Sequence, residues 1–206
     1  MKNTLTFILL TLIFLCSCNK PKQKTTDNTP ISDYYSSDYI AFQGKDNFEV
    51  INIDSLSNFS DLSITIDEMN CDNKIPGLTF SLDKSQYNFV GCSDCKKAKL
   101  KSCKGASSFI FIENDSIIRD LATKKKIHIS DLHKVLNEIN NGEYKYRTGK
   151  SSDFPIILNL NVDNKLPISM TKNVLSIIIG EFEQIHQSYK ILKYNYEIHF
   201  EPYEVL

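Results

Sequence analysis

The pattern of apolar and polar positions divides the chain into three parts. Residues 4–15 are almost entirely apolar, whereas residues 19–37 are rich in Lys, Gln, Thr, Asn and Pro and show no apolar periodicity. After these come short alternating runs and helical spacings. We therefore expect an N-terminal segment that is processed, a flexible tether over residues 18–38, and then the folded part.

The first section of the folded part, residues 39–107, is predicted to be rich in strands and loops. Alternating apolar runs predict short strands at residues 48–53, 62–66, 78–82 and 87–90. Ser and Asn residues between the first two runs are typical of a turn.

The second section of the folded part shows a clearer alternation of elements. Apolar runs predict strands at residues 108–113, 116–121, 127–129 and 155–162, and within residues 189–200. The run at 155–162 carries apolar residues on both faces, as an inner strand does.

Two helices are predicted between these strands. Ser130 is a suitable N-cap for the first, which Gly142 would end, and the second begins after Pro167. The order is strand, strand, helix, strand, helix, strand. It predicts an α+β fold for residues 108–206, with a mixed sheet and two helices on one face. The apolar positions with helical spacing are Leu132, Val135, Leu136 and Ile139 in the first helix, and Val174, Leu175, Ile178, Phe182 and Ile185 in the second.

The N-terminus has the pattern of a secretory signal. Lys2 gives a positive start, and the apolar run that follows is shorter than the roughly 20 residues that a membrane-spanning helix needs. The run ends in Leu15-Cys16-Ser17-Cys18, which resembles the lipobox of bacterial lipoproteins. Ser17 is the small residue before the cleavage point, so we expect residues 1–17 to be removed and Cys18 to be lipidated.

Lipidation would attach the protein to a membrane in the cell envelope. The resemblance implies a diacylglycerol on the Cys18 sulfur and an acyl chain on its new amine, and two or more chains anchor stably. No acidic cluster follows Cys18, although some lipoproteins displayed at the cell surface carry one there. We therefore expect a protein that faces the periplasm.

The element order from Phe109 to Phe200 resembles the periplasmic domain of the ExbD/TolR biopolymer transport proteins. The residues that carry this resemblance are the strand-turn-strand opening at 109–115, the strand and helix start at 127–132, and the strand followed by a helix at 155–170. The resemblance covers a little under half of the chain and includes no invariant motif. It implies a domain that contacts partner proteins or the cell-wall polymer.

The chain also departs from that family. The family has an N-terminal membrane helix with an Asp that takes part in proton-driven energy transfer, but the apolar segment of this chain contains no Asp. The resemblance therefore implies only a tethered relative of the soluble domain. Residues 39–105 have no recognised counterpart in the family.

Four cysteines lie in the folded part: Cys71, Cys92, Cys95 and Cys103. An even number in an exported protein favours structural disulfides, and four cysteines allow three connectivities. Two other interpretations remain open. Cys92 and Cys95 form a Cys-x-x-Cys pair that is typical of thiol-redox sites, and the four thiolates together could bind zinc.

Other chemistry has little support in the sequence. The formal net charge of −1 argues against nucleic-acid binding, and we interpret the lysines between residues 96 and 104 as a solvated loop. His128, His133, His186 and His199 are scattered, and no metal-binding His pair occurs. Only 7 glycines are present, and no phosphate-binding or nucleophile motif occurs. We interpret Asp61, Asp67 and Glu68 as surface acids.

The sequence therefore predicts a lipid-anchored envelope protein with a non-catalytic interaction domain. We expect no cofactor, no resident metal and no catalytic residue, and a partner that is a protein or the cell-wall polymer. The alternative is a thiol-redox or zinc protein centred on Cys92 and Cys95.

Overall fold

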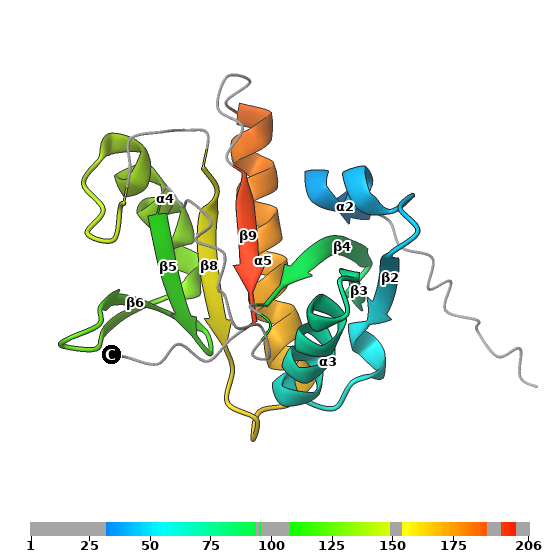
Figure 1. Cartoon of the computed structure of the whole chain (residues 1–206). Coiled ribbons are helices and arrows are strands. Elements are labelled where there is room, and N and C mark those ends of the chain that lie inside the picture. Colours follow the sequence, from blue (N-terminus) through cyan, green and yellow to red (C-terminus); the bar gives the residue numbers. More distant parts are fainter. Residues whose placement is uncertain (1–31, 94, 96–107, 149–153, 189–194, 201–206) are drawn as a thin grey trace, which may run out of the picture.

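A computed structural model describes residues 32–93, 95, 108–148, 154–188 and 195–200 (Figure 1). The strands are β1 (Ser32–Tyr35), β2 (Phe48–Asn52), β3 (Ile75–Leu82), β4 (Ser85–Cys92), β5 (Ser108–Glu113), β6 (Ser116–Asp120), β7 (Lys125–His128), β8 (Ile156–Asn161) and β9 (Tyr196–His199). The helices are α2 (Ser37–Phe42), α3 (Phe59–Cys71), α4 (Leu132–Asn141) and α5 (Ile168–Ser188), with short 3-10 helices η1 (Ile53–Ser55) and η2 (Ile129–Asp131). These elements confirm the predicted α+β class. Among the described residues, no helix is both long and apolar enough to cross a membrane.

All the described strands belong to one mixed sheet. The strand order is β2-β3-β4-β9-β8-β5-β6-β7, and β1 pairs with β4 beside this path. The strands before residue 107 meet those after it at β4 and β9, which run parallel through two register pairs, Gly91 with Ile198 and Cys92 with His199. The two sections of the folded part thus contribute to the same sheet.

The second half of the chain has the elements that its pattern predicts. β8 lies inside the sheet between β9 and β5. Figure 1 shows α4 and α5 behind β5, β8 and β9. Ile110 of β5 and Leu158 of β8 are fully buried, whereas Phe111, next along β5, is partly exposed. This alternation gives the sheet one core-facing side, which the helices cover. Gly142 ends α4 in the left-handed conformation at φ 78°.

The prediction of a strand at residues 62–66 is wrong, because this segment is part of α3. Leu62, Ile64 and Ile66 alternate as in a strand, but Phe59, Leu62, Ile66 and Met69 also have helical spacing, and these four are the buried ones. Ile64 is exposed. The Asn58 side chain caps the helix by accepting a hydrogen bond from Asp61 N.

Two boundaries also differ from the prediction. Ser130 does not cap α4, since residues 129–131 form η2 and the N-cap of α4 is Asp131, which makes no side-chain cap hydrogen bond. The predicted tether, residues 18–38, extends too far toward the C-terminus. β1 begins at Ser32 and pairs in parallel with β4, and Tyr34 stacks on Tyr87.

One hydrophobic core joins the two halves of the chain. It contains residues of α3, β3 and β4 together with residues of α4, α5, β5, β8 and β9. Phe200, directly after β9, stacks on Phe59 of α3 at 6.1 Å and on Phe89 of β4 at 6.4 Å between ring centroids. Its backbone carbonyl accepts a hydrogen bond from Ser63 Oγ at 2.6 Å. Phe200 therefore connects the end of the C-terminal strand to the N-terminal elements.

Candidate functional site

A cluster of three side chains with metal-binding or acid-base chemistry lies where the two parts of the sheet join. Cys92 is the last residue of β4, and Glu197 and His199 lie two positions apart on β9. Cys92 is in register with His199. Because side chains alternate along a strand, Glu197 and His199 share one face, while Ile198 between them is buried in the core. The strand register thus places a sulfur, a carboxylate and an imidazole together.

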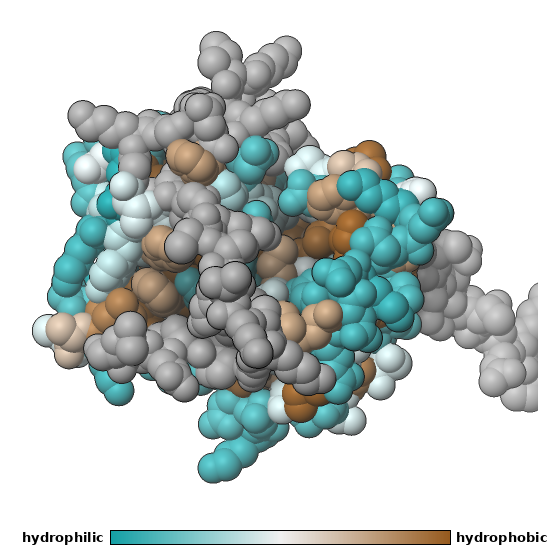
Figure 2. All heavy atoms as spheres, in the orientation of Figure 1, coloured by the Kyte–Doolittle hydropathy of each residue, from teal (hydrophilic) through white to brown (hydrophobic). Residues whose placement is uncertain are grey.

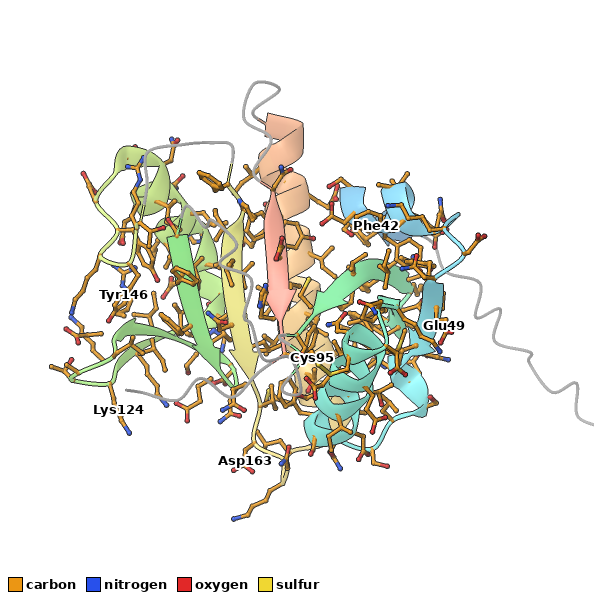
Figure 3. All side chains as sticks on the ribbon, in the orientation of Figure 1. Phe42, Glu49, Cys95, Lys124, Tyr146 and Asp163 are labelled. Atoms are coloured by element: carbon orange, nitrogen blue, oxygen red, sulfur yellow. A yellow bond between two sulfur atoms is a disulfide. The ribbon has the colours of Figure 1, made fainter. Side chains whose placement is uncertain are left out.

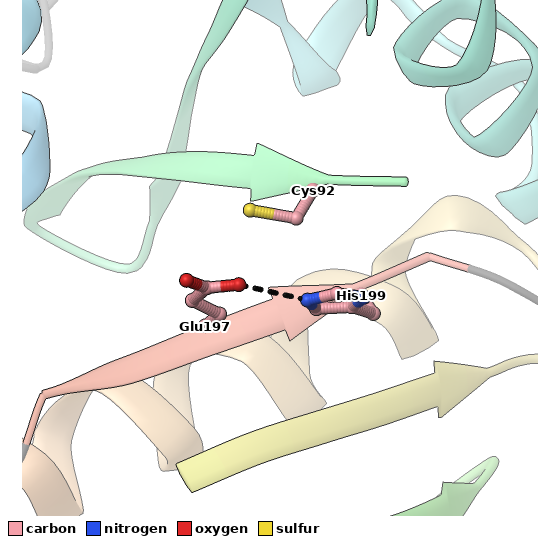
Figure 4. A group of neighbouring side chains, drawn as sticks. All are labelled: Cys92, Glu197 and His199. Carbon is pink, nitrogen blue, oxygen red and sulfur yellow. Dashed lines mark hydrogen bonds and ion pairs between the residues drawn. The ribbon is translucent and has the colours of Figure 1, made fainter. Parts of the chain in front are cut away.

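The three side chains point toward a common space between β4 and β9 (Figure 4). His199 Nε2 lies 3.0 Å from Glu197 Oε2, within hydrogen-bonding distance. One possible ligand atom from each residue lies within 4.8 Å of those of the other two, Cys92 Sγ included. His199 is only 9% exposed, and Cys92 is half-buried. On the opposite, core-facing side of β9, burial raises the pKa of the Tyr196 hydroxyl.

Hydrogen bonds hold the backbone on both sides of this cluster. Phe200 N donates to Cys92 O at 3.0 Å, which continues the pairing of β9 with β4. The residue after Cys92 is held by α3, because Ser93 Oγ donates to Asp67 Oδ1 at 3.1 Å and Asn70 Nδ2 donates to Ser93 O at 3.1 Å. The position of the Cys92 backbone is therefore set by both β9 and α3.

A disulfide strengthens the link to α3. Cys71, the last residue of α3, is bonded to Cys95, with their Cα atoms 4.9 Å apart. Figure 3 shows Cys95 beside α3. Two of the four candidate cysteines thus form a disulfide with each other, and Cys92 is not part of this bond. Cys103 lies outside the described residues.

This pairing changes the other two interpretations of the cysteines. While Cys95 is bonded to Cys71, it cannot act as the second thiol of a redox pair with Cys92. A zinc site made of all four thiolates cannot form in this state either. Cys92 has Glu197 and His199 as its chemical neighbours instead.

The remaining candidates are not brought together. His128 is exposed and lies 3.7 Å from Asp115, and His133 lies on the exposed side of α4. Asp61 and Glu68 are exposed on α3. The predicted lipidation site Cys18 and the lysines between residues 96 and 104 lie outside the described residues.

Sequence reasoning did not single out Glu197 and His199 as partners of Cys92. Glu-x-His on a strand places both side chains on one face, and this local signal was available. The pairing with Cys92 was not, because it depends on the register between β4 and β9.

No protein-family model, curated protein or solved structure matches this chain.

Proposed function

We propose that this protein is a lipid-anchored protein of the cell envelope, held by Cys18 and facing the periplasm, with a non-catalytic domain that binds a partner protein or the cell-wall polymer. The observation that carries the location is the Cys71–Cys95 bond in a chain that begins with a signal and lipobox pattern. Disulfides persist in exported proteins and are rare in the reducing cytosol. The disulfide and the signal and lipobox pattern are independent features, and both support a location in the cell envelope.

The binding part of the proposal is supported by exposed apolar side chains on the first described elements of the chain. Tyr35, Ile40 and Val50 are 41%, 57% and 54% exposed, and they lie on β1, α2 and β2, the elements that follow the tether. Figure 2 shows apolar atoms at the surface beside α2. Exposed apolar groups that gather at one end of a domain are typical of an interaction surface. The nature of the partner is taken from the resemblance to ExbD/TolR domains and is an analogy.

Replacing Cys18 with serine is expected to abolish membrane attachment, because serine offers no sulfur for the diacylglycerol. Cells expressing the wild-type chain in a bacterial host are labelled with palmitate and separated into membrane and soluble fractions. We expect label and membrane recovery for the wild type and neither for Cys18→Ser. Cys16→Ser is the matched control and should keep both. Label on Cys18→Ser, or its loss only from Cys16→Ser, would contradict the assignment of Cys18.

Photo-crosslinking tests the interaction surface in intact cells. A photoreactive amino acid at Ile40 or Val50 is expected to give a discrete crosslinked product with one protein or with cell-wall material. The same group at Phe154, which is 47% exposed but lies two residues before β8, is the control position and should give none. Equal products from all three positions, or none from any, would count against an interaction surface on α2 and β2.

A further inference from the structure

We propose that Cys92, Glu197 and His199 form a binding site for one Zn²⁺ ion at the junction of β4 and β9. This site is distinct from the interaction surface, and it requires none of the properties proposed above. It differs from the four-cysteine arrangement that the sequence allows, since Cys92 is its one sulfur ligand.

The donor set fits zinc. Thiolate sulfur, imidazole nitrogen and carboxylate oxygen are the three kinds of protein ligand that Zn²⁺ takes, at about 2.0–2.3 Å. Ligand atoms around one such ion lie about 3.5 Å apart. Those of Cys92, Glu197 and His199 already lie within 4.8 Å of one another, so small side-chain rotations suffice to bring them onto one ion. A fourth, open position would be filled by water, as in three-ligand zinc sites.

Charge and burial favour a cation at this position. The Cys92 thiolate and the Glu197 carboxylate together carry two negative charges, which one Zn²⁺ neutralises when His199 is neutral. His199 and Glu197 have side chains that are only 11% and 20% exposed, so like charges there would be poorly hydrated without a cation. The ion would replace the His199–Glu197 hydrogen bond and displace the thiol proton, which leaves to solvent.

The same donors argue against the common hard cations. Ca²⁺ takes six to eight oxygen ligands, and Mg²⁺ prefers an octahedral shell of oxygens. This cluster offers one carboxylate, and its other two donors are nitrogen and sulfur.

The position of the site gives the ion a structural consequence. β4 and β9 pair through only two register positions, yet this pairing joins the two parts of the sheet. Cys92 belongs to one part, and Glu197 and His199 belong to the other. An ion bound by all three would link the two parts across this short junction, so zinc should raise the resistance of the whole fold to unfolding.

The test is a zinc titration of the whole protein as it is purified from the expressing cells, without reductant so that the Cys71–Cys95 bond is kept. Competition with a colorimetric chelator measures affinity and stoichiometry, and Co²⁺ replaces Zn²⁺ to reveal a thiolate-to-metal absorption band. We expect one ion per chain and a thiolate band. Even the loss of an outer-shell partner weakens metal binding about 10–100-fold, so Cys92→Ser, Glu197→Gln and His199→Gln should each weaken it by about 100-fold or more.

Matched controls separate coordination from folding. His128→Gln removes an exposed histidine far along the sheet and should bind zinc like the wild type. Zinc should raise the melting temperature of the wild type and of His128→Gln, but not that of Cys92→Ser, which alters only the sulfur atom. If a glutamine variant fails to fold, Cys92→Ser carries the test.

Three results would overturn the proposal. The first is a wild-type protein that binds no zinc. The second is Cys92→Ser binding zinc as tightly as the wild type. The third is a Cys92–Cys103 disulfide in the purified protein, found by peptide mass spectrometry.

Discussion

Replacing Phe200 with alanine is expected to lower the free energy of unfolding by about 3–5 kcal/mol, as for other large aromatic residues removed from a packed core. Phe200 is fully buried, and its ring stacks on Phe59 and Phe89, which belong to α3 and β4. The substitution removes apolar contact area and leaves a cavity between elements from both halves of the chain. Small domains are stable by only about 5–15 kcal/mol, so this loss is a large part of the total.

Denaturant unfolding followed by circular dichroism measures this effect. Ile64→Ala is the matched control, because Ile64 is 54% exposed on α3 and truncation there should change the stability by no more than about 0.5 kcal/mol. Loss of the Phe200 ring should also make the unfolding of the two halves of the chain less cooperative, which would broaden the unfolding transition. A Phe200→Ala protein as stable as the Ile64→Ala control would contradict the central place of this ring in the core.

The second half of the fold could be predicted because each signal there was local. Gly142 ends α4 in the left-handed backbone conformation, which glycine adopts readily. The apolar spacing of α5 predicts one buried stripe, and Leu175 and Ile178 in this stripe are fully buried. β8 is apolar on both faces, and the neighbours Ile157 and Leu158, which point to opposite faces, are both buried. Each of these features shows in a short stretch of the sequence.

The first half was harder because its local signals conflict. The segment around Leu62 and Ile66 satisfies both the period of a strand and that of a helix, and β-branched residues favour the strand. The segment is a helix in the structure, and Phe59 and Met69 extend its buried apolar stripe on either side. The sequence places β1 in the tether, because a segment of 4 residues without an apolar run gives no sign that β4 has an edge with which it can pair.

The candidate site depends on the least predictable feature of the fold. Cys92 and His199 are far apart in the sequence, and they meet because β4 and β9 pair in one particular register. A shift of one residue would turn Ile198 to the site and His199 to the core. The apolar residues on the core face, which must remain buried, therefore also fix which polar groups converge on the other face.

The disulfide and this register are physically connected. Cys95 follows β4 by three positions, and its bond to Cys71 holds that segment against the end of α3. α3 in turn contacts Phe200 beyond β9 through Phe59 and Ser63. The bond therefore braces the end of β4, where Cys92 lies.

Removing this disulfide is expected to lower the free energy of unfolding by about 3.5 kcal/mol. The two cysteines are 24 positions apart in the sequence, and cross-linking a loop of that length reduces the entropy of the unfolded chain by the corresponding amount. The double variant Cys71→Ser/Cys95→Ser avoids leaving one unpaired thiol. Its stability is compared with the wild type by denaturant unfolding, with and without reductant.

Reductant should destabilise the wild type and leave the double variant unchanged, because only the wild type has this bond to lose. Cys92→Ser serves as the control for altering a cysteine as such, and in metal-free buffer it should keep the wild-type response to reductant. Because the bond braces the end of β4, amide hydrogen exchange at Gly91 and Cys92 should also quicken in the double variant. If the double variant were as stable as the wild type and equally protected at these amides, the Cys71–Cys95 bond would have no structural role. The link from α3 to the junction would then rest on the hydrogen bonds of Ser93 with Asp67 and Asn70 and on the contacts of α3 with Phe200.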